Sequence, residues 1–287
     1  MPLSFSILAC GRLLTYDRPQ LVGILNVTPD SFSDGGRFLH VDHAVAHAER
    51  LVEAGAAWLD IGGESTRPGA VPVDEAEETA RLLPVLERVA SKVAVPISVD
   101  TMKAGVARRA LDAGAVVIND VSALRADPRM AGVIAERGAG LVLMHMRGTP
   151  QTMQQDPHYH DVVQEVRAFL QDRLLFAESS GIAPRQIVLD PGFGFGKLVE
   201  HNVTLLKQLA SLTSLERPLM VGISRKAFLG RLTQRTVEDR TIATATALAL
   251  AVERGAALLR VHDVAAMRDA VAVAAAVLDS GPSPSSR

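Results

Sequence analysis

The sequence has few of the features that mark secreted, membrane-spanning or nucleic-acid-binding proteins. Its 287 residues include a single cysteine, Cys10, which excludes an internal disulfide and suits a reducing compartment. No apolar run approaches the ~20 residues that cross a bilayer. The formal net charge is -2 and no block of like charge appears, so no nucleic-acid-binding surface is predicted. We therefore expect a cytosolic protein that binds neither membranes nor nucleic acids.

Apolar segments are plentiful, and the first long one is the most informative. With 48% hydrophobic and 22% charged residues, the chain can bury a full core. The run from Leu21 to Leu25 is apolar at every position except Gly23 and is followed by Asn26. An unbroken run of this kind predicts a strand buried on both faces, as in a parallel sheet covered by helices. Asn26 then stands at the carboxyl end of the strand, where parallel α/β folds carry their chemistry.

The same pattern of strand and helix recurs along the chain. The predicted strands are residues 21–25, 58–62, 96–100, 116–120, 141–145, 187–190, 219–224 and 258–261. Five helices end at a glycine, the residue that favours a left-handed cap: Gly55, Gly114, Gly138, Gly181 and Gly255. Eight such units in ~250 residues, with no polar edge strand, predict a closed (β/α)8 barrel rather than a doubly wound open sheet.

Other boundaries follow from local signals. A short N-terminal hairpin over residues 4–17, turning at Gly11, is expected to close the bottom of the barrel. Asp42 is predicted to cap the first helix, and Asp74 and Glu77 have capping-box spacing before the second. Later helices are expected near residues 202–212 and 238–254. The prediction is one domain, residues 1–280, with a disordered tail, residues 281–287.

Polar residues end nearly every predicted strand, and in a barrel they would converge on one pocket. They are Asn26, Asp60, Asp100, Asn119, Asp120, His145, Asp190, Ser224, Arg260 and His262. Helix capping is an equally good explanation for Asp60, Asp120 and Asp263. It explains Asp100 and Asp190 less well, because ionised carboxylates in a barrel mouth are costly without a partner. A ligand that offers hydrogen-bond donors would supply one.

Two loops add further ligand features. Thr66, Arg67 and Gly69 combine a hydroxyl, a forked cation and a flexible backbone, which suits an anionic group. Arg260 and His262 indicate the same at the end of the last strand, a recurrent phosphate site in barrels, although either arginine alone could form a surface ion pair. The loop 191–197 lacks the dinucleotide-binding spacing, but Phe193 and Phe195 alternate with glycine and could expose a ring for stacking. The predicted ligand is a flat, donor-rich heterocycle with an anionic group.

Eight segments resemble, in order, the motifs of the dihydropteroate synthase family. They are NVTPDSFSDGG, DIGGESTRPGA, SVDT, INDVSALR, MHMRGTP, LDPGFGFGK, GISRKAFLG and RVHDV, and all of them lie between Leu21 and Val264. Members of that family are (β/α)8 barrels, usually homodimers. They join 4-aminobenzoate to 6-hydroxymethyl-7,8-dihydropterin diphosphate and release diphosphate in folate biosynthesis.

The resemblance implies roles for individual residues. The pterin would be bound by Asp100, Asn119, Met144, Asp190, Phe195 and Lys226. The diphosphate would be bound by Asn26, Thr66, Arg67, Arg260 and His262, with Asn26 also binding Mg²⁺. The 4-aminobenzoate pocket would comprise Phe32, Arg67, Pro68, Phe195 and Ser224. The catalytic set would be Asn26, Thr66, Arg67, Asp100, Lys226, Arg260 and His262. No departure from the family pattern is seen at these positions, so sulfonamides are expected to compete with the substrate.

Alternative functions make distinct predictions. A pterin-binding methyltransferase barrel would not need the Thr66–Arg67 anion loop or the Arg260–His262 pair. A Schiff-base aldolase would use Lys226 and be trapped by borohydride. A metal-dependent hydrolase is disfavoured because the first strand lacks a paired histidine motif. A non-catalytic pterin-binding paralogue would bind the pterin without turnover.

Overall fold

The computed structural model describes residues 4–27 and 37–279 of the chain. The predicted tail and Phe32 lie outside these ranges. The elements in chain order are β1 (Phe5–Ala9), β2 (Arg12–Tyr16), β3 (Gln20–Asn26), α1 (Arg37–Glu53), β4 (Trp58–Gly62), α2 (Glu75–Ala90), β5 (Ile97–Asp100), α3 (Ala104–Asp112), β6 (Val117–Asp120), α4 (Met130–Arg137), β7 (Gly140–Met144), α5 (Val162–Ser179), η2 (Pro184–Gln186), β8 (Ile187–Asp190), α6 (Val199–Lys207), η3 (Leu209–Leu215), β9 (Leu219–Val221), α7 (Ala227–Thr233), α8 (Thr241–Glu253), β10 (Ala256–Val261) and α9 (Val264–Leu278).

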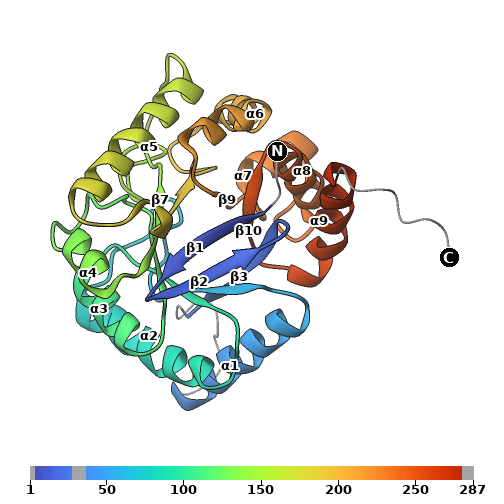
Figure 1. Ribbon diagram of the computed structural model, residues 1–287. Coiled ribbons are helices and arrows are strands. Elements are labelled where there is room, and N and C mark those ends of the chain that lie inside the picture. Colours follow the sequence, from blue (N-terminus) through green and yellow to red (C-terminus); the bar gives the residue numbers. More distant parts are fainter. Residues whose placement is uncertain (1–3, 28–36, 280–287) are drawn as a thin grey trace.

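Eight parallel strands close into a barrel in the order β10-β3-β4-β5-β6-β7-β8-β9, and helices surround it (Figure 1). The predicted (β/α)8 barrel is therefore confirmed. The register pairs Gly62 with Asp100, Asp100 with Asn119, and Met144 with Asp190. The carboxyl ends of these strands thus lie beside one another, as a site built from strand ends requires.

The N-terminal hairpin of β1 and β2 lies across one end of the barrel (Figure 1). Its turn uses Cys10 and Gly11, both with positive φ. Ile7 and Ala9 are fully buried and pack with the barrel-floor residues Val22, Trp58, Val117, Val142, Val188, Met220 and Leu258. The hairpin therefore closes the floor, as predicted, and the opposite mouth holds the strand ends.

Most predicted helix boundaries are confirmed. All five terminal glycines have positive φ, the conformation that a side chain would strain. Asp74 is the N-cap of α2, and its Oδ1 accepts a 2.7 Å hydrogen bond from the Glu77 amide. Among the described residues, no helix combines the length and apolar character needed to cross a bilayer.

Three helix boundaries were wrong, and β9 ends at Val221 rather than at the predicted residue 224. Asp42 does not cap α1, which begins at Arg37, and its carboxylate instead forms an ion pair with Arg88 of α2. The helix expected over 202–212 is α6 followed by the 3₁₀ segment η3, where Ser211, Thr213 and Ser214 donate to carbonyls three residues back. Such local bonds compete with regular α-helix. The helix expected over 238–254 begins at Thr241, and α7 precedes it.

Candidate active site

Five polar side chains near the strand ends face the barrel interior. Each stands two residues after a residue of the barrel floor or, for Asp100, after Ser98, which bonds the floor residue Trp58, and side chains two apart on a strand share a face. The pairs are Trp58 and Asp60, Ser98 and Asp100, Val117 and Asn119, Val188 and Asp190, and Leu258 and Arg260. The strand period therefore gathers three carboxylates, an amide and a guanidinium at the barrel mouth.

Arg260 joins two of these carboxylates. Its Nε lies 2.5 Å from Oδ2 of Asp60, and its Nη2 lies 3.0 Å from Oδ2 of Asp100. Asp60 also accepts hydrogen bonds from the Ser98 hydroxyl and, at 3.2 Å, from Nδ2 of Asn119. These bonds connect β4, β5, β6 and β10 across the barrel.

Two oxygens in this cluster are buried without a hydrogen-bond partner among the described residues: Oδ1 of Asp100 and Oδ1 of Asn119. The side chains are only 7% and 4% exposed, so water does not readily satisfy them. Burial raises the pKa of Asp100, against the opposing attraction of Arg260. Burial likewise raises the pKa of Asp190 to about 6, although the Gly192 amide donates to its Oδ1. Buried acceptors of this kind are costly until a ligand donates to them.

The wall formed by the loops after β8, β9 and β10 carries cationic and aromatic groups. Lys226 Nζ lies 4.0 Å from the centroid of the Phe195 ring. Burial, reinforced by Arg260, lowers the pKa of Lys226 to about 8. His262 Nδ1 lies 3.0 Å from Oγ of Ser224, and burial lowers the pKa of His262 to about 4, so this imidazole is neutral at pH 7. The wall offers donors to an anion and a ring face to a flat ligand.

The glycine-rich loop after β8 is held in place by hydrogen bonds from Lys197, which is 4% exposed. Its Nζ lies 2.8 Å from the Gly192 carbonyl, 3.2 Å from the Phe195 carbonyl and 2.8 Å from Nδ1 of His145. Phe193 is fully buried and stacks on Phe228, whereas Phe195 is only half-buried. Of the two predicted stacking rings, Phe195 is therefore the one available to a ligand.

The loop after β4 carries Thr66, which is half-buried, and Arg67 and Pro68, which are exposed. The structure does not bring these three side chains into the cluster at the mouth. At the base of the loop, Oε1 of Glu64 accepts from the Val73 amide at 3.2 Å.

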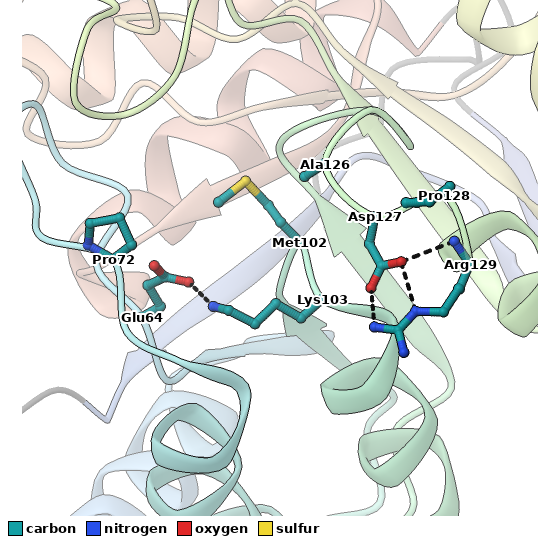
Figure 2. Close-up of a pocket in the computed structure, with 8 residues that line it drawn as sticks. All are labelled: Glu64, Pro72, Met102, Lys103, Ala126, Asp127, Pro128 and Arg129. Atoms are coloured by element: carbon teal, nitrogen blue, oxygen red, sulfur yellow. Dashed lines mark hydrogen bonds and ion pairs between the residues drawn. The ribbon is translucent and has the colours of Figure 1, made fainter.

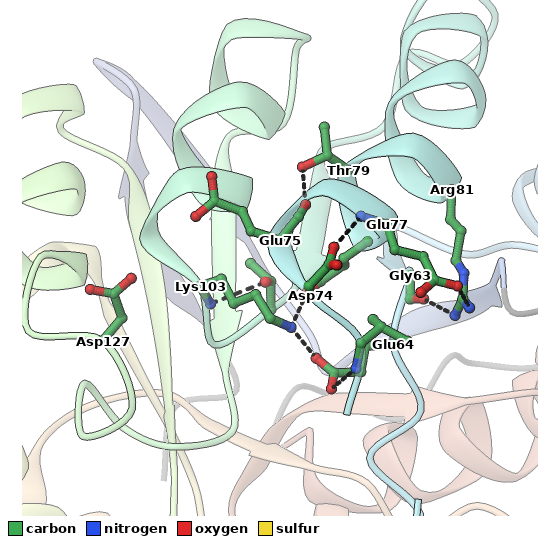
Figure 3. Close-up of polar contacts among 12 residues, drawn as sticks. Gly63, Glu64, Asp74, Glu75, Glu77, Thr79, Arg81, Lys103 and Asp127 are labelled. Atoms are coloured by element: carbon green, nitrogen blue, oxygen red, sulfur yellow. Dashed lines mark hydrogen bonds and ion pairs between the residues drawn. The ribbon is translucent and has the colours of Figure 1, made fainter. Parts of the chain in front are cut away.

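The other carboxylate oxygen of Glu64 is bound by Lys103, as Figure 3 shows. Lys103 Nζ lies 2.5 Å from Oε2 of Glu64 and 2.6 Å from Oε2 of the fully buried Glu78. Burial raises the pKa of Glu78, and Lys103 opposes that rise. Beside this triad lies a cavity of about 500 Å³ (Figure 2). Its lining is Glu64, Pro72, Met102, Lys103, Ala126, Asp127, Pro128 and Arg129, none of them a predicted site residue.

The comparisons with known proteins agree with this geometry. Residues 22–262 match the family described as pterin binding enzyme. The chain belongs to the pterin-binding enzyme family. It is 45% identical to the dihydropteroate synthase of Synechocystis sp. (strain PCC 6803) over 261 residues, which is 91% of this chain and 90% of the relative. It is 43% identical to the Escherichia coli K12 dihydropteroate synthase, covering 96% and 97% of the two chains.

Solved members of the pterin-binding family have the same fold. The Xanthomonas albilineans dihydropteroate synthase with 4-aminobenzoic acid is 51% identical, with a TM-score of 0.91 over 97% of this chain and 100% of that one. The Yersinia pestis dihydropteroate synthase in a sulfonamide drug complex is 44% identical, with a TM-score of 0.89 over 95% and 99%. A further X. albilineans structure, in complex with 7,8-dihydropteroate, is 47% identical, with a TM-score of 0.86 over 96% and 100%.

For this pterin-binding chain, the structure places most predicted site residues around the barrel mouth. Asp100, Asn119, Asp190 and Arg260 lie at strand ends facing the interior, Met144 is buried at the end of β7, and Asn26 is half-buried at the end of β3. Phe195, Ser224, Lys226 and His262 follow β8, β9 and β10.

Three other polar residues near strand ends do not join the cluster. Asp120 accepts from the amides of Ser122 and Leu124 and so caps its own loop. His145 packs edge-on against Phe169 and bonds Lys197, so its expected place in the pocket was wrong. Asp263 pairs with Arg225 at 2.6 Å.

Sequence reasoning missed the roles of Ser98, Lys197 and the triad of Glu64, Lys103 and Glu78. It also left Asp60 undecided between a cap and a ligand group. The signal that could have placed Asp60 is its spacing of two from Trp58, which sets it on the interior face.

Proposed function

We propose that this chain acts as a dihydropteroate synthase, joining 4-aminobenzoate to 6-hydroxymethyl-7,8-dihydropterin diphosphate with release of diphosphate. The observation that carries the proposal is a pair of buried acceptors at the barrel mouth, Oδ1 of Asp100 and Oδ1 of Asn119, which have no hydrogen-bond partner among the described residues. They call for a ligand edge rich in N–H donors, and the amino-pyrimidinone edge of a pterin is one. The named relatives and the bound molecules in their structures point to the same reaction.

The pterin would lie with its donor edge toward Asp100, Asn119 and Asp190. Ionised carboxylates accept strong hydrogen bonds from such an edge, which offsets the burial that raises the pKa of both aspartates. Lys226 would donate to the carbonyl side of the ring, and Phe195, which already lies under the Lys226 ammonium, would contact the ring face. Met144 would supply apolar contact. The hydrogen-bonding roles fall to Asp100, Asn119, Asp190 and Lys226, and the apolar contacts to Met144 and Phe195.

The diphosphate would be held by Asn26, Thr66, Arg67, Arg260 and His262. The residues present also fit a magnesium ion, because Mg²⁺ takes oxygen ligands, keeps several waters and shares phosphate oxygens, so it needs few protein ligands. Asn26 supplies an amide oxygen at the end of β3, and the described residues hold no group of three carboxylate, histidine or cysteine side chains placed so that it could hold a metal ion. When bound, the ion would neutralise charge on the departing diphosphate.

The chemistry requires no dedicated general base. The C–O bond between the pterin methylene and diphosphate breaks, and the electron-rich ring delocalises the positive charge left behind. The amine nitrogen of 4-aminobenzoate then forms the new C–N bond and loses a proton. Arg260 and the N–H of neutral His262 stabilise the departing oxygen by charge and hydrogen bonding. The path is SN1-like, and loop closure over the mouth would exclude water.

The 4-aminobenzoate pocket would comprise Arg67, Pro68, Phe195 and Ser224, with Phe32 outside the described residues. Arg67 and Pro68 are exposed on the loop after β4, so this pocket is completed when that loop moves toward Phe195. One relative is solved with 4-aminobenzoic acid and another in a sulfonamide drug complex, and sulfonamides are expected to compete with 4-aminobenzoate for this pocket.

A homodimer is also proposed, through the outer faces of α8 and α9. These helices pack against each other and lie together at one side of the barrel (Figure 1). They expose four large apolar side chains: Ile242 (81%), Leu250 (41%), Val273 (65%) and Val277 (79%). A second copy of the chain would bury this face. Light scattering should show a dimer for the native protein and a monomer for Val273→Asp. A cytosolic location remains the expectation from the single cysteine.

The deciding experiment measures diphosphate release from the pterin diphosphate with and without 4-aminobenzoate, each in Mg²⁺ or EDTA. Metal-dependent release coupled to dihydropteroate formation is expected, and release without the amine would support the SN1-like path. Pterin binding without release would favour a non-catalytic paralogue or a methyltransferase. Borohydride trapping of Lys226 by substrate would favour the aldolase.

A further inference from the structure

Asp60 is fully enclosed at the centre of the network, yet the chemistry proposed above gives it no role. It is 1% exposed, and its Oδ2 accepts from Arg260 Nε at 2.5 Å and from Asn119 Nδ2 at 3.2 Å. Its Oδ1 accepts from the Ser98 hydroxyl. An isolated buried carboxylate is costly, so three donors converging on one side chain indicate a specific task.

The directions of these hydrogen bonds are set from the barrel floor. The indole N–H of Trp58 can only donate, and it lies 2.8 Å from the Ser98 oxygen. Since that oxygen already accepts from the indole, the hydroxyl donates its one proton, and Oδ1 of Asp60 is a nearer acceptor than the Leu59 carbonyl at 3.2 Å. The carboxylate therefore only accepts, and Asn119 has to turn its NH₂ group toward it. The opposite orientation would set two acceptor oxygens, Oδ1 of Asn119 and Oδ2 of Asp60, against each other.

The consequence reaches the ligand face of the site. With Nδ2 of Asn119 held by Asp60, the atom left for a ligand is Oδ1, which is buried and has no partner among the described residues. An asparagine amide could in principle offer either a donor or an acceptor. Here the hydrogen bonds from Trp58 through Ser98 to Asp60 leave the acceptor, Oδ1 of Asn119, for the ligand. Asp60 also holds Nε of the Arg260 guanidinium, while Nη2 bonds Asp100.

We propose that Asp60 is a specificity-determining positioning residue. With Trp58 and Ser98, it orients the Asn119 amide so that Oδ1 of Asn119 accepts a hydrogen bond from an N–H of the ligand. The inference rests on the proposed function for the identity of the ligand as a pterin. It assigns no contact between Asp60 and the substrate. It predicts that Asp60 matters because of the direction of its hydrogen bonds, rather than because of its charge alone.

An exchange of the two side chains tests this directly. Asn119→Asp places two carboxylates against each other and should weaken pterin binding by about 100-fold, as expected when buried charged groups lose their partners. The double variant Asp60→Asn, Asn119→Asp restores a donor facing an acceptor and still presents an oxygen to the ligand. It should regain at least about tenfold in affinity over Asn119→Asp. The measurement is the calorimetric Kd of the pterin diphosphate without 4-aminobenzoate.

The control is Asp112→Asn, a matched change at the far end of α3 where Asp112 pairs with Arg137; its Kd should equal that of the native protein. A double variant that folds but binds no better than Asn119→Asp would overturn the inference while leaving the proposed function intact. Native protein that does not bind pterin at all would instead overturn the proposed function.

A second measurement uses only the native protein, should the variants fail to fold. It compares 6-hydroxymethylpterin with the matched pteridine-2,4-dione, which has a carbonyl in place of the 2-amino group. At least about tenfold weaker binding of the dione is expected, because its carbonyl would face an acceptor. Equal affinity would overturn the inference.

Discussion

Arg260 and Asp100 are 160 residues apart in the sequence, and their Nη2 and Oδ2 atoms lie 3.0 Å apart across the barrel mouth. A ligand that donates to Oδ1 of Asp100, which has no partner among the described residues, shares this carboxylate with Arg260. Because Nε of Arg260 is separately held by Asp60, the guanidinium can give up Asp100 without losing its anchor. Ligand entry and the placement of the arginine are therefore coupled through a single carboxylate.

Replacing Arg260 by methionine should lower both stability and turnover. The change leaves the carboxylates of Asp60 and Asp100 buried without their cation, which costs about 3–5 kcal/mol in the free energy of unfolding. Urea unfolding measures this loss, and kcat should fall more than the Kd of the pterin rises. Arg225→Met is the matched control, since its pair with Asp263 is 43% and 40% exposed and should be worth at most about 1 kcal/mol. Equal losses for the two variants would contradict the assignment.

The pH dependence of the free energy of unfolding should show the titration of the Asp190 carboxyl group. Burial raises its folded pKa from 3.8 to about 6, so the folded state holds a proton that the unfolded state has already released. Its contribution to stability is present below pH 4 and is lost as the pH rises from about 4 to about 6. Two pKa units correspond to about 3 kcal/mol. The native protein should therefore lose stability relative to Asp190→Asn across this range, measured by urea unfolding at each pH, and a constant difference would contradict the raised pKa.

Much of the fold could be predicted because each barrel strand is followed by a helix, and five of the helices end at a glycine. The apolar runs and the terminal glycines act locally, so they can be read without tertiary contacts. Asp42 failed for the opposite reason, because its ion pair with Arg88 joins two helices that are distant in the sequence. The 3₁₀ segment at Ser211 also escaped prediction, since its serine and threonine bonds act against the regular helical period.

The sequence allowed us to predict which residues end the strands, but not which of their side chains face the barrel interior. Asn119 and Asp120 are neighbours, yet only Asn119 faces the interior. Likewise, Met144 faces the interior and its neighbour His145 does not. A shift of one residue along a strand turns the side chain to the opposite face. Whether a residue belongs to the site therefore depends on which alternate positions of its strand face the barrel interior. Lys197 could not be placed at all, because its partners are carbonyls of its own loop and one distant ring.

Replacing Lys197 by methionine should loosen the glycine-rich loop. The apolar stem is kept, but the carbonyls of Gly192 and Phe195 and Nδ1 of His145 lose their shared donor. Buried acceptors left unpaired cost about 1–3 kcal/mol each, so a loss of about 3 kcal/mol is expected in urea unfolding. The pterin Kd should also rise, because Phe195 is carried on this loop. Lys207→Met, at an exposed position, is the control, and a similar result for both variants would argue against the fastening role.

The triad at the base of the loop after β4 leads to the last prediction. Lys103→Met leaves the carboxylates of Glu64 and Glu78 facing each other without a cation, and Glu78 is fully buried. We expect a loss of about 3 kcal/mol in the free energy of unfolding. Because Glu64 also binds the Val73 amide at the far end of the loop, the KM for 4-aminobenzoate should rise while the pterin Kd stays unchanged.

Lys92→Met, at an exposed position, is the matched control and should change neither quantity. Glu64→Gln keeps an oxygen for the Val73 amide but removes the ion pair, so its effect should overlap with that of Lys103→Met. In a double-mutant cycle the two changes should couple by at least about 1 kcal/mol, the size expected for residues in one network. Strict additivity, or a pterin Kd that rises as much as the KM for 4-aminobenzoate, would show that the triad does not hold the loop that carries Thr66, Arg67 and Pro68.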